Sequence, residues 1–411
     1  MTTVAVIGGG LIGSAAATWL LADGFDVTLF ERDPEGRPAS TGGAGLICLP
    51  EISPLARPGT LLSVPGWLMD PLGPLSLRAR DLPAMTPWLA RLAWSARPSQ
   101  VDHATAALGF LMKTALADHQ ELTRRADAKP YMRRTGALYI YDNDAGFASG
   151  LAEWKERARH GVDYQQLSAN EARSLFPVLK TGFARAVFAP ESWMSTSPLE
   201  VLKALRAAVT ARGRILAEPV HEVRGESESV VVATSNGQEH RFDRALVAGG
   251  VWSRDLVRKL GLSVLLETER GYNTTYPDPP FDIPMPLFVS EHGFVLSQVA
   301  DGLRIGGAVE LAAPDAPPNF ARAAAMRTKL RRYIPDLPET GGREWMGCRP
   351  STPDSLPVIG PHPGDPRIVF AFGHGHVGLT LSAVTARHAA ALFSGRPRER
   401  NLESFGIERF H

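Results

Sequence analysis

Cysteine is scarce in this chain, which holds only Cys48 and Cys348 among its 411 residues. The two lie far apart, and neither belongs to a C-x-x-C pair. Iron–sulfur clusters and structural zinc sites require several closely spaced thiolates, so the sequence predicts no metal site of either kind. The low cysteine content also fits a reducing compartment.

Neither sign of charge predominates, because 44 Lys and Arg face 43 Asp and Glu and give a net charge of +1 at pH 7. No basic stretch carries interleaved aromatic residues, so we expect no nucleic-acid partner. Met1–Thr3 contains no Lys or Arg, and glycines interrupt the apolar stretch Val4–Leu21. This pattern argues against a secretory signal and a membrane span. We expect a cytoplasmic protein whose contact with the inner membrane face, where there is any, is peripheral.

A glycine-rich turn near the N-terminus is the most informative feature that is present. A β-branched run leads into three glycines in G-x-G-x-x-G spacing, a helix-prone stretch, and a second short strand that ends in an acid: Val4–Ile7, Gly8, Gly10, Gly13, Ser14–Leu21, Val27–Phe30 and Glu31. This is a βαβ unit with the dinucleotide-binding fingerprint in its expected context. The alternative, a glycine-rich turn in an unrelated α/β protein, lacks a reason for the acid.

Each residue of this fingerprint has a separate physical task. Gly8 permits the tight turn, Gly10 lets the backbone approach a pyrophosphate, and Gly13 lets the helix pack close to the strand. The helix N-terminus offers free N–H groups and the positive end of a dipole. Glu31 is expected to accept hydrogen bonds from an adenosine ribose.

The length and the pattern beyond this unit indicate a second domain, because 411 residues exceed one compact core. Short helices joined by turns are expected over Pro50–Ser99. Longer amphipathic helices are expected over Asp102–Asp127, Leu199–Arg212 and Thr380–Ser394. Strands are expected over Gly136–Tyr141, Val220–Val223, Val230–Thr234, Ala245–Ala248, Phe294–Gln298, Leu303–Val309 and Ile368–Phe372. His119 lies on the apolar stripe of its helix and is interpreted as a packed core histidine.

Four motifs in order resemble the D-amino-acid oxidase superfamily of flavoproteins, most closely its bacterial D-amino-acid dehydrogenases. They are the fingerprint, the Gly249–Ser253 turn, the Trp345–Pro350 block with its following Asp354 and Gly360, and the turn Gly373–Thr380 into the last helix. The likeness spans essentially the whole chain. One departure is Thr41–Gly45, where relatives usually carry an Asn before Ala-Gly.

The resemblance implies an α/β fold with a Rossmann-like FAD-binding domain, interleaved with a substrate domain on a mixed, mostly antiparallel sheet. We assign residues 1–50, 150–262 and 345–411 to the former, and 51–149 and 263–344 to the latter. It also implies non-covalent FAD, because Cys348 is one residue out of place for the cysteine that links flavin in some sarcosine oxidases. The implied FAD contacts are Gly8, Gly10, Leu11, Ile12, Gly13, Glu31, Arg32, Thr41, Ala44, Gly45, Val220, Gly249, Trp252, Gly375, His376, Val377, Gly378, Leu379 and Thr380.

Oxidation of an amino acid at its α carbon requires an anchored carboxylate, a neutral amine and a C–H that points at the acceptor atom, flavin N5. Arg349 is the candidate anchor, because a planar guanidinium makes two parallel bonds to a carboxylate. Arg349 stands where the resembling proteins place their carboxylate-binding arginine. His376 is a candidate proton shuttle, and Tyr272 is the aromatic residue chosen to line the substrate pocket. Loop packing and backbone geometry are the alternative for His376, and core packing is the alternative for Tyr272.

The resemblance therefore predicts an FAD-dependent dehydrogenase. Its substrate would be a D-amino acid or a cyclic secondary amino acid such as D-proline or D-hydroxyproline, its product an imine, and its electron acceptor quinone-like. One alternative is an oxidase that uses oxygen. Another is the flavin subunit of a hetero-oligomeric opine, sarcosine or hydroxyproline dehydrogenase. A non-catalytic nucleotide-binding factor would leave Arg349 and the Gly373–Thr380 turn without a joint purpose.

Overall fold

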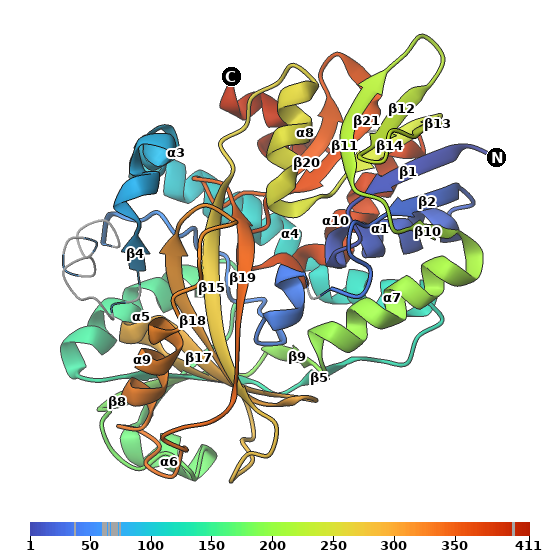
Figure 1. Ribbon diagram of the computed structural model, residues 1–411. Helices are drawn as coiled ribbons and strands as arrows, with labels where there is room; N and C mark the ends of the chain where they lie inside the picture. Colours follow the sequence, from blue (N-terminus) through green and yellow to red (C-terminus); the bar gives the residue numbers. More distant parts are fainter. Residues whose placement is uncertain (37, 60–63, 65, 67–72, 74, 397–398) are drawn as a thin grey trace.

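Two large β-sheets with helices around them make up the molecule (Figure 1). The computed structural model describes all residues except 37, 60–63, 65, 67–72, 74 and 397–398. Part of the segment Pro50–Ser99, including Trp67, lies outside the described residues. The later part of that segment contains α3 (Leu82–Ser95).

The first sheet has six strands in the order β10-β2-β1-β14-β21-β20. Their bounds are β10 Arg214–Leu216, β2 Asp26–Phe30, β1 Thr3–Ile7, β14 Arg244–Val247, β21 Asp365–Phe372 and β20 Val358–His362. The first five strands are parallel, and β20 runs antiparallel to β21. Val4 pairs with Val27 on one side and with Arg244 on the other. Strands from the start, middle and end of the chain therefore lie next to one another.

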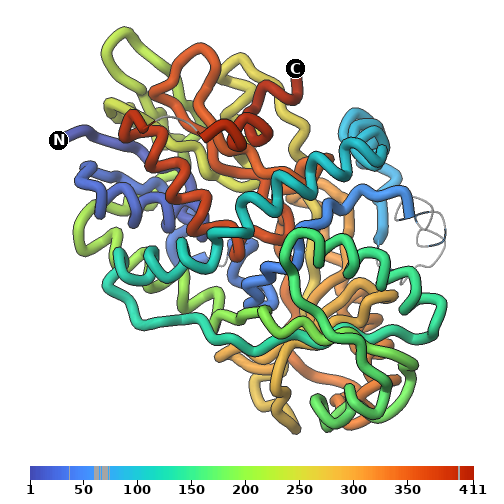
Figure 2. The backbone as a smooth tube through the Cα atoms, turned by 180° about the vertical axis from the view of Figure 1, so that it is seen from behind, coloured from blue at the N-terminus to red at the C-terminus, as the bar shows by residue number. Residues whose placement is uncertain are grey.

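Apolar side chains alternate between the two faces of this sheet and build two cores. Val4 and Val6 face one core, which is closed by α1 (Leu11–Ala22), α4 (Pro98–Arg125), α7 (Pro198–Arg212) and α10 (Gly378–Phe393). Figure 2 shows α4 and α10 side by side behind the sheet. Ala5 and Ile7 face the other core, under β11 (Val220–Gly225), β12 (Val230–Thr234), β13 (Glu239–Phe242) and α8 (Ser253–Lys259). Helices thus cover one face, and a three-stranded antiparallel sheet covers the other.

The second sheet has nine strands, with the path β19-β15-β18-β17-β16-β6-β8-β7 and with β4 paired to β18. Their bounds are β19 Arg343–Ser351, β15 Glu267–Tyr276, β18 Gly302–Leu311, β17 Phe294–Val299, β16 Leu287–Val289, β6 Ala137–Tyr141, β8 Arg185–Ala189, β7 Gln165–Ser168 and β4 Leu75–Leu77. All neighbours are antiparallel except the pairs β16–β6 and β18–β4.

One face of the second sheet packs on α9 (Ala321–Leu330) and α6 (Ala169–Leu175); we call it the outer face. The opposite, inner face carries the odd-numbered residues of β15 and β19, and it lies against the 39–45 loop. At its ends it meets α3 and α5 (Asp144–Arg159). A small sheet of β3 (Leu46–Ile47), β9 (Trp193–Ser195) and β5 (Met132–Arg134) continues from that loop.

This architecture confirms the predicted fold, a Rossmann-like α/β unit interleaved with a mixed, mostly antiparallel sheet. One part of the predicted division differs from the structure. Residues 150–195 were assigned to the nucleotide-binding unit, but β8 pairs with β6 in the second sheet and β7 pairs with β8. The reason is that β8 pairs along the whole of β6, which lies before the predicted boundary. The helix predicted over Asp102–Asp127 begins earlier, at Pro98.

Candidate cofactor and substrate site

The turn after β1 is shaped to admit a ligand. Gly8 adopts φ +105°, and a Cβ there would lie 2.5 Å from the carbonyl oxygen of Ala248. A Cβ on Gly13 would lie 1.8 Å from the carbonyl oxygen of Gly8, so the helix can approach the strand only with glycine present. At Gly10 no heavy atom lies within 4 Å of the Cβ position. The turn is therefore closed around Gly8 and Gly13 and open in front of Gly10, where a pyrophosphate fits.

The acid at the end of β2 is held in place by backbone groups. Glu31 Oε2 accepts a hydrogen bond from Gly9 N at 2.8 Å, and its Oε1 accepts one from Asp33 N at 3.0 Å. Arg206 of α7 lies 3.5 Å from Glu31 Oε2 and donates to the carbonyl oxygen of Gly9. Sequence reasoning missed Arg206, because no motif links it to a turn almost two hundred residues earlier.

Other residues predicted to contact FAD surround this acid. The Arg32 guanidinium carbon lies 3.4 Å from the centroid of the Trp252 ring, which is 44% exposed. Gly249 follows β14 beside Gly8, as the contact at Gly8 also shows. Val220 begins β11 and packs at the edge of the core that contains Phe30. Leu11 and Ile12 form the first turn of α1.

The second glycine-rich loop is fastened to the inner face of the nine-stranded sheet. Arg304 of β18 donates to the carbonyl oxygens of Thr41 and Gly43, at 3.2 and 2.6 Å. Asn273 of β15 donates to the carbonyl oxygen of Gly42 at 2.8 Å. Gly45 adopts φ +77°, and its carbonyl oxygen accepts from Ser195 N. Backbone contacts thus hold the loop that carries Thr41, Ala44 and Gly45, although Gly43 stands where relatives have an Asn.

The last helix, α10, points its N-terminus toward the same region. Within the described part of the chain, the backbone N–H groups of Gly378, Leu379 and Thr380 have no acceptor. The Thr380 hydroxyl accepts from Cys48 N at 3.0 Å, which ties the helix to the end of β3. Free N–H groups and the positive end of the helix dipole favour negative charge, which reduced flavin carries on its pyrimidine side. The N-terminus of α10 is therefore suited to a negatively charged group.

His119 braces this helix N-terminus from α4. Its Nε2 lies 3.0 and 3.1 Å from the carbonyl oxygens of Leu379 and Thr380 and donates to them, so Nδ1 accepts from the Tyr131 hydroxyl at 2.9 Å. Burial lowers the pKa of His119 to about 4. The prediction of a packed core histidine is confirmed, with a positioning contribution that the sequence did not reveal.

The candidate anchor Arg349 lies on the inner face of the nine-stranded sheet. In the register of β19 with β15, Arg349 lies opposite Glu269. A Cβ on Gly271 would lie 2.3 Å from the Arg349 Nη2. The guanidinium thus lies over Gly271, where any larger residue would displace it. No hydrogen bond or ion pair joins Arg349 to any described residue, although burial lowers its pKa and nearby Glu269 opposes that effect. A half-buried guanidinium that no described residue pairs with is suited to receive an anion.

Tyr272, predicted from the sequence to line the substrate pocket, does not lie beside Arg349. Tyr272 lies on the outer face, where its hydroxyl donates to Glu310 and accepts from Asn319 N at 3.0 Å. Side chains alternate along β15, so Tyr272 and Gly271 point in opposite directions. Cys348 likewise alternates with Arg349 and lies beside Pro314 on the outer side.

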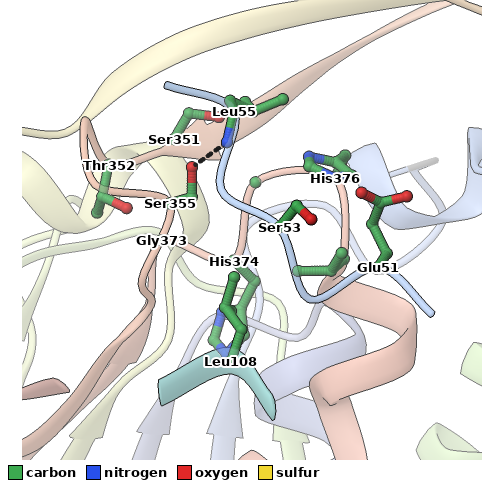
Figure 3. A pocket seen from close by; sticks show the side chains of 12 residues that line it. Glu51, Ser53, Leu55, Leu108, Ser351, Thr352, Ser355, Gly373, His374 and His376 are labelled. Carbon is green, nitrogen blue, oxygen red and sulfur yellow. Dashed lines mark hydrogen bonds between the residues drawn. The ribbon is translucent and has the colours of Figure 1, made fainter. Parts of the chain in front are cut away.

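A pocket lies between the 51–55 segment, the end of β19 at Ser351, and the Gly373–Val377 turn (Figure 3). Two buried polar atoms of its lining, Ser351 Oγ and His374 Nδ1, have no hydrogen-bond partner among the described residues. Burial lowers the pKa of His374 to about 3, so this ring is neutral, and its Nε2 lies 2.9 Å from Thr385 Oγ1. His376 is exposed and lies next to Glu51.

Among the described residues, no helix combines the length and apolar character needed to cross a membrane.

Comparison with known proteins places these features in one family. The family model described as FAD dependent oxidoreductase (DAO) matches residues 3–392. A D-amino-acid oxidase of Bradyrhizobium diazoefficiens is 35% identical over 99% of this chain and 98% of its own length. A D-amino acid dehydrogenase of Paramagnetospirillum magneticum is 30% identical over the same shares of the two chains. The solved glycine oxidase of Geobacillus kaustophilus superposes with a TM-score of 0.76 at 21% identity, covering 99% of both chains.

Proposed function

Because this chain belongs to the DAO family of FAD-dependent oxidoreductases, we propose that it oxidises a D-amino acid or a cyclic secondary amino acid at the α carbon. The product is an imine. Water hydrolyses an open-chain imine, whereas the cyclic imine formed from a cyclic amino acid persists. The observation that carries this proposal is Arg349, which lies half-buried on the inner face with no hydrogen bond or ion pair to any described residue. An anionic substrate group would complete its hydrogen bonding.

The residues of the candidate site divide into two groups, one for the cofactor and one for the substrate. The Gly8–Gly13 turn and Glu31 would hold the adenosine and pyrophosphate of FAD, and the N-terminus of α10 would stabilise negative charge at its other end. When bound, FAD supplies the acceptor for the hydride that leaves the α carbon. Arg349 fixes the carboxylate, and so turns the α C–H toward the acceptor. His376, exposed at the pocket, is positioned to pass a proton to solvent.

FAD is proposed to be bound without a covalent link. Cys348 supports this, because its side chain lies on the opposite side of β19 from Arg349. Cys48 is closer to α10, but burial raises its pKa to about 12, and its Sγ lies 3.7 Å from the Tyr139 hydroxyl. A thiol that stays protonated is a poor nucleophile.

A quinone-like acceptor is proposed for the electrons, in line with the dehydrogenase relative. Oxygen is the second candidate acceptor, favoured by the 35% identity to a protein named an oxidase. The motifs proposed to bind FAD and substrate would serve a dehydrogenase and an oxidase equally. The choice therefore depends on access to the bound flavin and on the charge around it, not on the presence of these motifs.

An anaerobic bleaching screen tests the proposed reaction. The flavin-loaded protein is mixed with D- and L-amino acids, D-proline, D-hydroxyproline and sarcosine, and flavin absorbance is followed. We expect loss of the oxidised spectrum with at least one D-amino acid or cyclic secondary amino acid. Retention of the oxidised spectrum with every compound would contradict the proposal. Sarcosine alone as the active compound would shift the assignment to N-methyl substrates.

A further inference from the structure

Glu269 is a buried acid that no described residue binds. It is 3% exposed and lies on the inner face of β15, directly across from Arg349. No hydrogen bond or ion pair joins its carboxylate to any described residue. The next inner-face residues of β15 are Gly271 and then Asn273. The Arg349 guanidinium lies over Gly271. The two opposite charges are therefore neighbours without being in contact.

Glu310 shows how the same sheet treats an acid whose role is structural. It is also 3% exposed, but on the outer face. Its carboxylate pairs with Arg270 at 3.1 Å and with Arg78 at 3.2 Å, and it accepts from the Tyr272 hydroxyl. Burying a carboxylate is costly unless cations or donors satisfy it. Glu310 is satisfied by the protein, whereas Glu269 is left to a ligand.

Apart from Arg349, the inner-face neighbours of Glu269 include an apolar side chain and a second acid. Its neighbour on β18 is Leu311, which packs with Met85 and Trp88 of α3. Glu267, two residues earlier on the same face, is already paired with Arg254 at 2.6 Å. Ser351, the next inner-face residue of β19 after Arg349, lines the pocket described above. A ligand that reaches from this pocket along the inner face of β19 would meet a cation and an anion side by side.

We propose that Glu269 binds the substrate's amino group while Arg349 binds its carboxylate, so that the pair recognises the zwitterion of an α-amino acid. This assignment rests on the proposed function. Amine and carboxylate are attached to the same carbon, and the two side chains come from directly paired residues of neighbouring strands. The Glu269 carboxylate also takes one proton from the ammonium: an N–H bond breaks, an O–H bond forms, and the neutral amine keeps the electron pair. The proton leaves later to water.

The test compares an amino acid with the same molecule lacking its amine. The ligands are the best amino-acid substrate of the bleaching screen and its des-amino carboxylic acid, measured as KM and as competitive Ki on the flavin-loaded protein. In Glu269→Gln we expect KM for the amino acid to rise about 10- to 100-fold, the range of a lost charge-assisted hydrogen bond. Ki for the des-amino acid should fall, because a negative charge beside Arg349 is gone. Glu269→Asp should restore part of the amino-acid affinity.

Glu267→Gln is the matched control, because it removes an acid from the same strand and face that is already paired. It should not move the two ligands in opposite directions. Melting temperature and flavin content verify that each variant is folded and loaded. A parallel shift of KM and Ki in Glu269→Gln, or an unchanged KM, would overturn the role of Glu269 alone. Failure of any amino acid to reduce the wild-type protein would overturn the proposed function and this assignment together.

Discussion

A charged side chain that no described residue pairs with is the feature that decides the chemistry at the scale of single residues. Most arginines of this protein that are largely buried, such as Arg270 and Arg304, are held by acids or carbonyl oxygens. Arg349 has neither in the described chain, and burial lowers its pKa without abolishing its charge. Folding retains such a group only because the rest of the sheet fixes it. The same reasoning applies to Glu269 on the neighbouring strand.

Replacing Arg349 with Lys should strongly reduce kcat/KM for amino acids while FAD stays bound. A lysine cannot make two parallel bonds to a carboxylate, so the loss should be about 2–5 kcal/mol in transition-state free energy. Steady-state kinetics on the best substrate measures the loss, and flavin content verifies the holoenzyme. A decarboxylated amine should be equally poor with both proteins.

Arg270→Lys provides the matched control, since Arg270 is a buried arginine on the opposite face of β15. It should lower the melting temperature rather than discriminate between carboxylates and amines. Near-normal kinetics of Arg349→Lys on the best amino acid would show that the carboxylate is anchored elsewhere.

The sequence was sufficient to propose Arg349, because that residue stands inside a contiguous motif. It was not sufficient for Glu269, Arg206 or the direction of Tyr272. Those depend on which strands pair and in which register, and β15 and β19 are separated by some seventy residues. One step in that register would turn Tyr272 and Gly271 to the opposite faces. Local patterns therefore predict residues within a motif better than partners across strands.

At the scale of elements, α10 links the cofactor region to the pH of the solution. Its first turn leaves three N–H groups free, and His119 holds two of its carbonyl oxygens from α4. Burial gives His119 a pKa of about 4, below the ordinary 6.5. The unfolded chain therefore takes up the proton first as the pH falls. The contribution of His119 to the free energy of unfolding is therefore complete above pH 6.5 and is lost between pH 6.5 and about 4.

We expect the free energy of unfolding to fall through this window, with His119 contributing roughly 3 kcal/mol. Urea unfolding of the protein at half-unit pH steps measures the slope. His119→Gln, which keeps a donor but does not titrate, should be less stable at pH 7 and show a flatter slope between pH 6.5 and 4. An unchanged slope in this variant would assign the acid sensitivity to other groups, such as His374.

The strands and helices themselves were largely predictable, because they depend on local periodicity. The βαβ unit, β12 and β17 agree with the predicted ranges within a residue or two. The start of α4 was missed because Pro98 occupies the first helical position, where proline is tolerated and marks a beginning rather than a break. Propensity alone does not distinguish those two uses of proline.

At the scale of the whole molecule, the chain passes between the two sheets several times. Strands of the first sheet come from residues near 3, 26, 214, 244, 358 and 365, and strands of the second sheet fill most of the intervals. The sequence predicted this interleaving but did not place β7 and β8 in the second sheet, since the pairing of β8 with β6 and of β7 with β8 is a tertiary contact. The site lies where the two units meet, so its access route is a property of their packing and not of any motif.

The electron acceptor is therefore the prediction that belongs to the whole molecule. We expect a dehydrogenase, for which a quinone analogue is a good acceptor and oxygen a poor one. Oxygen reacts with reduced flavin according to the access that the surrounding protein allows and the positive charge near the reacting atoms. Arg349 supplies such charge only when no carboxylate neutralises it, and Glu269 opposes it across the strand pair. Stopped-flow reoxidation of the substrate-reduced protein in air-saturated buffer should consequently be slower than steady-state turnover with the quinone analogue. Reoxidation by air that exceeds this turnover would instead make the protein an oxidase, and Glu269→Gln would then be expected to accelerate it further by removing the opposing charge.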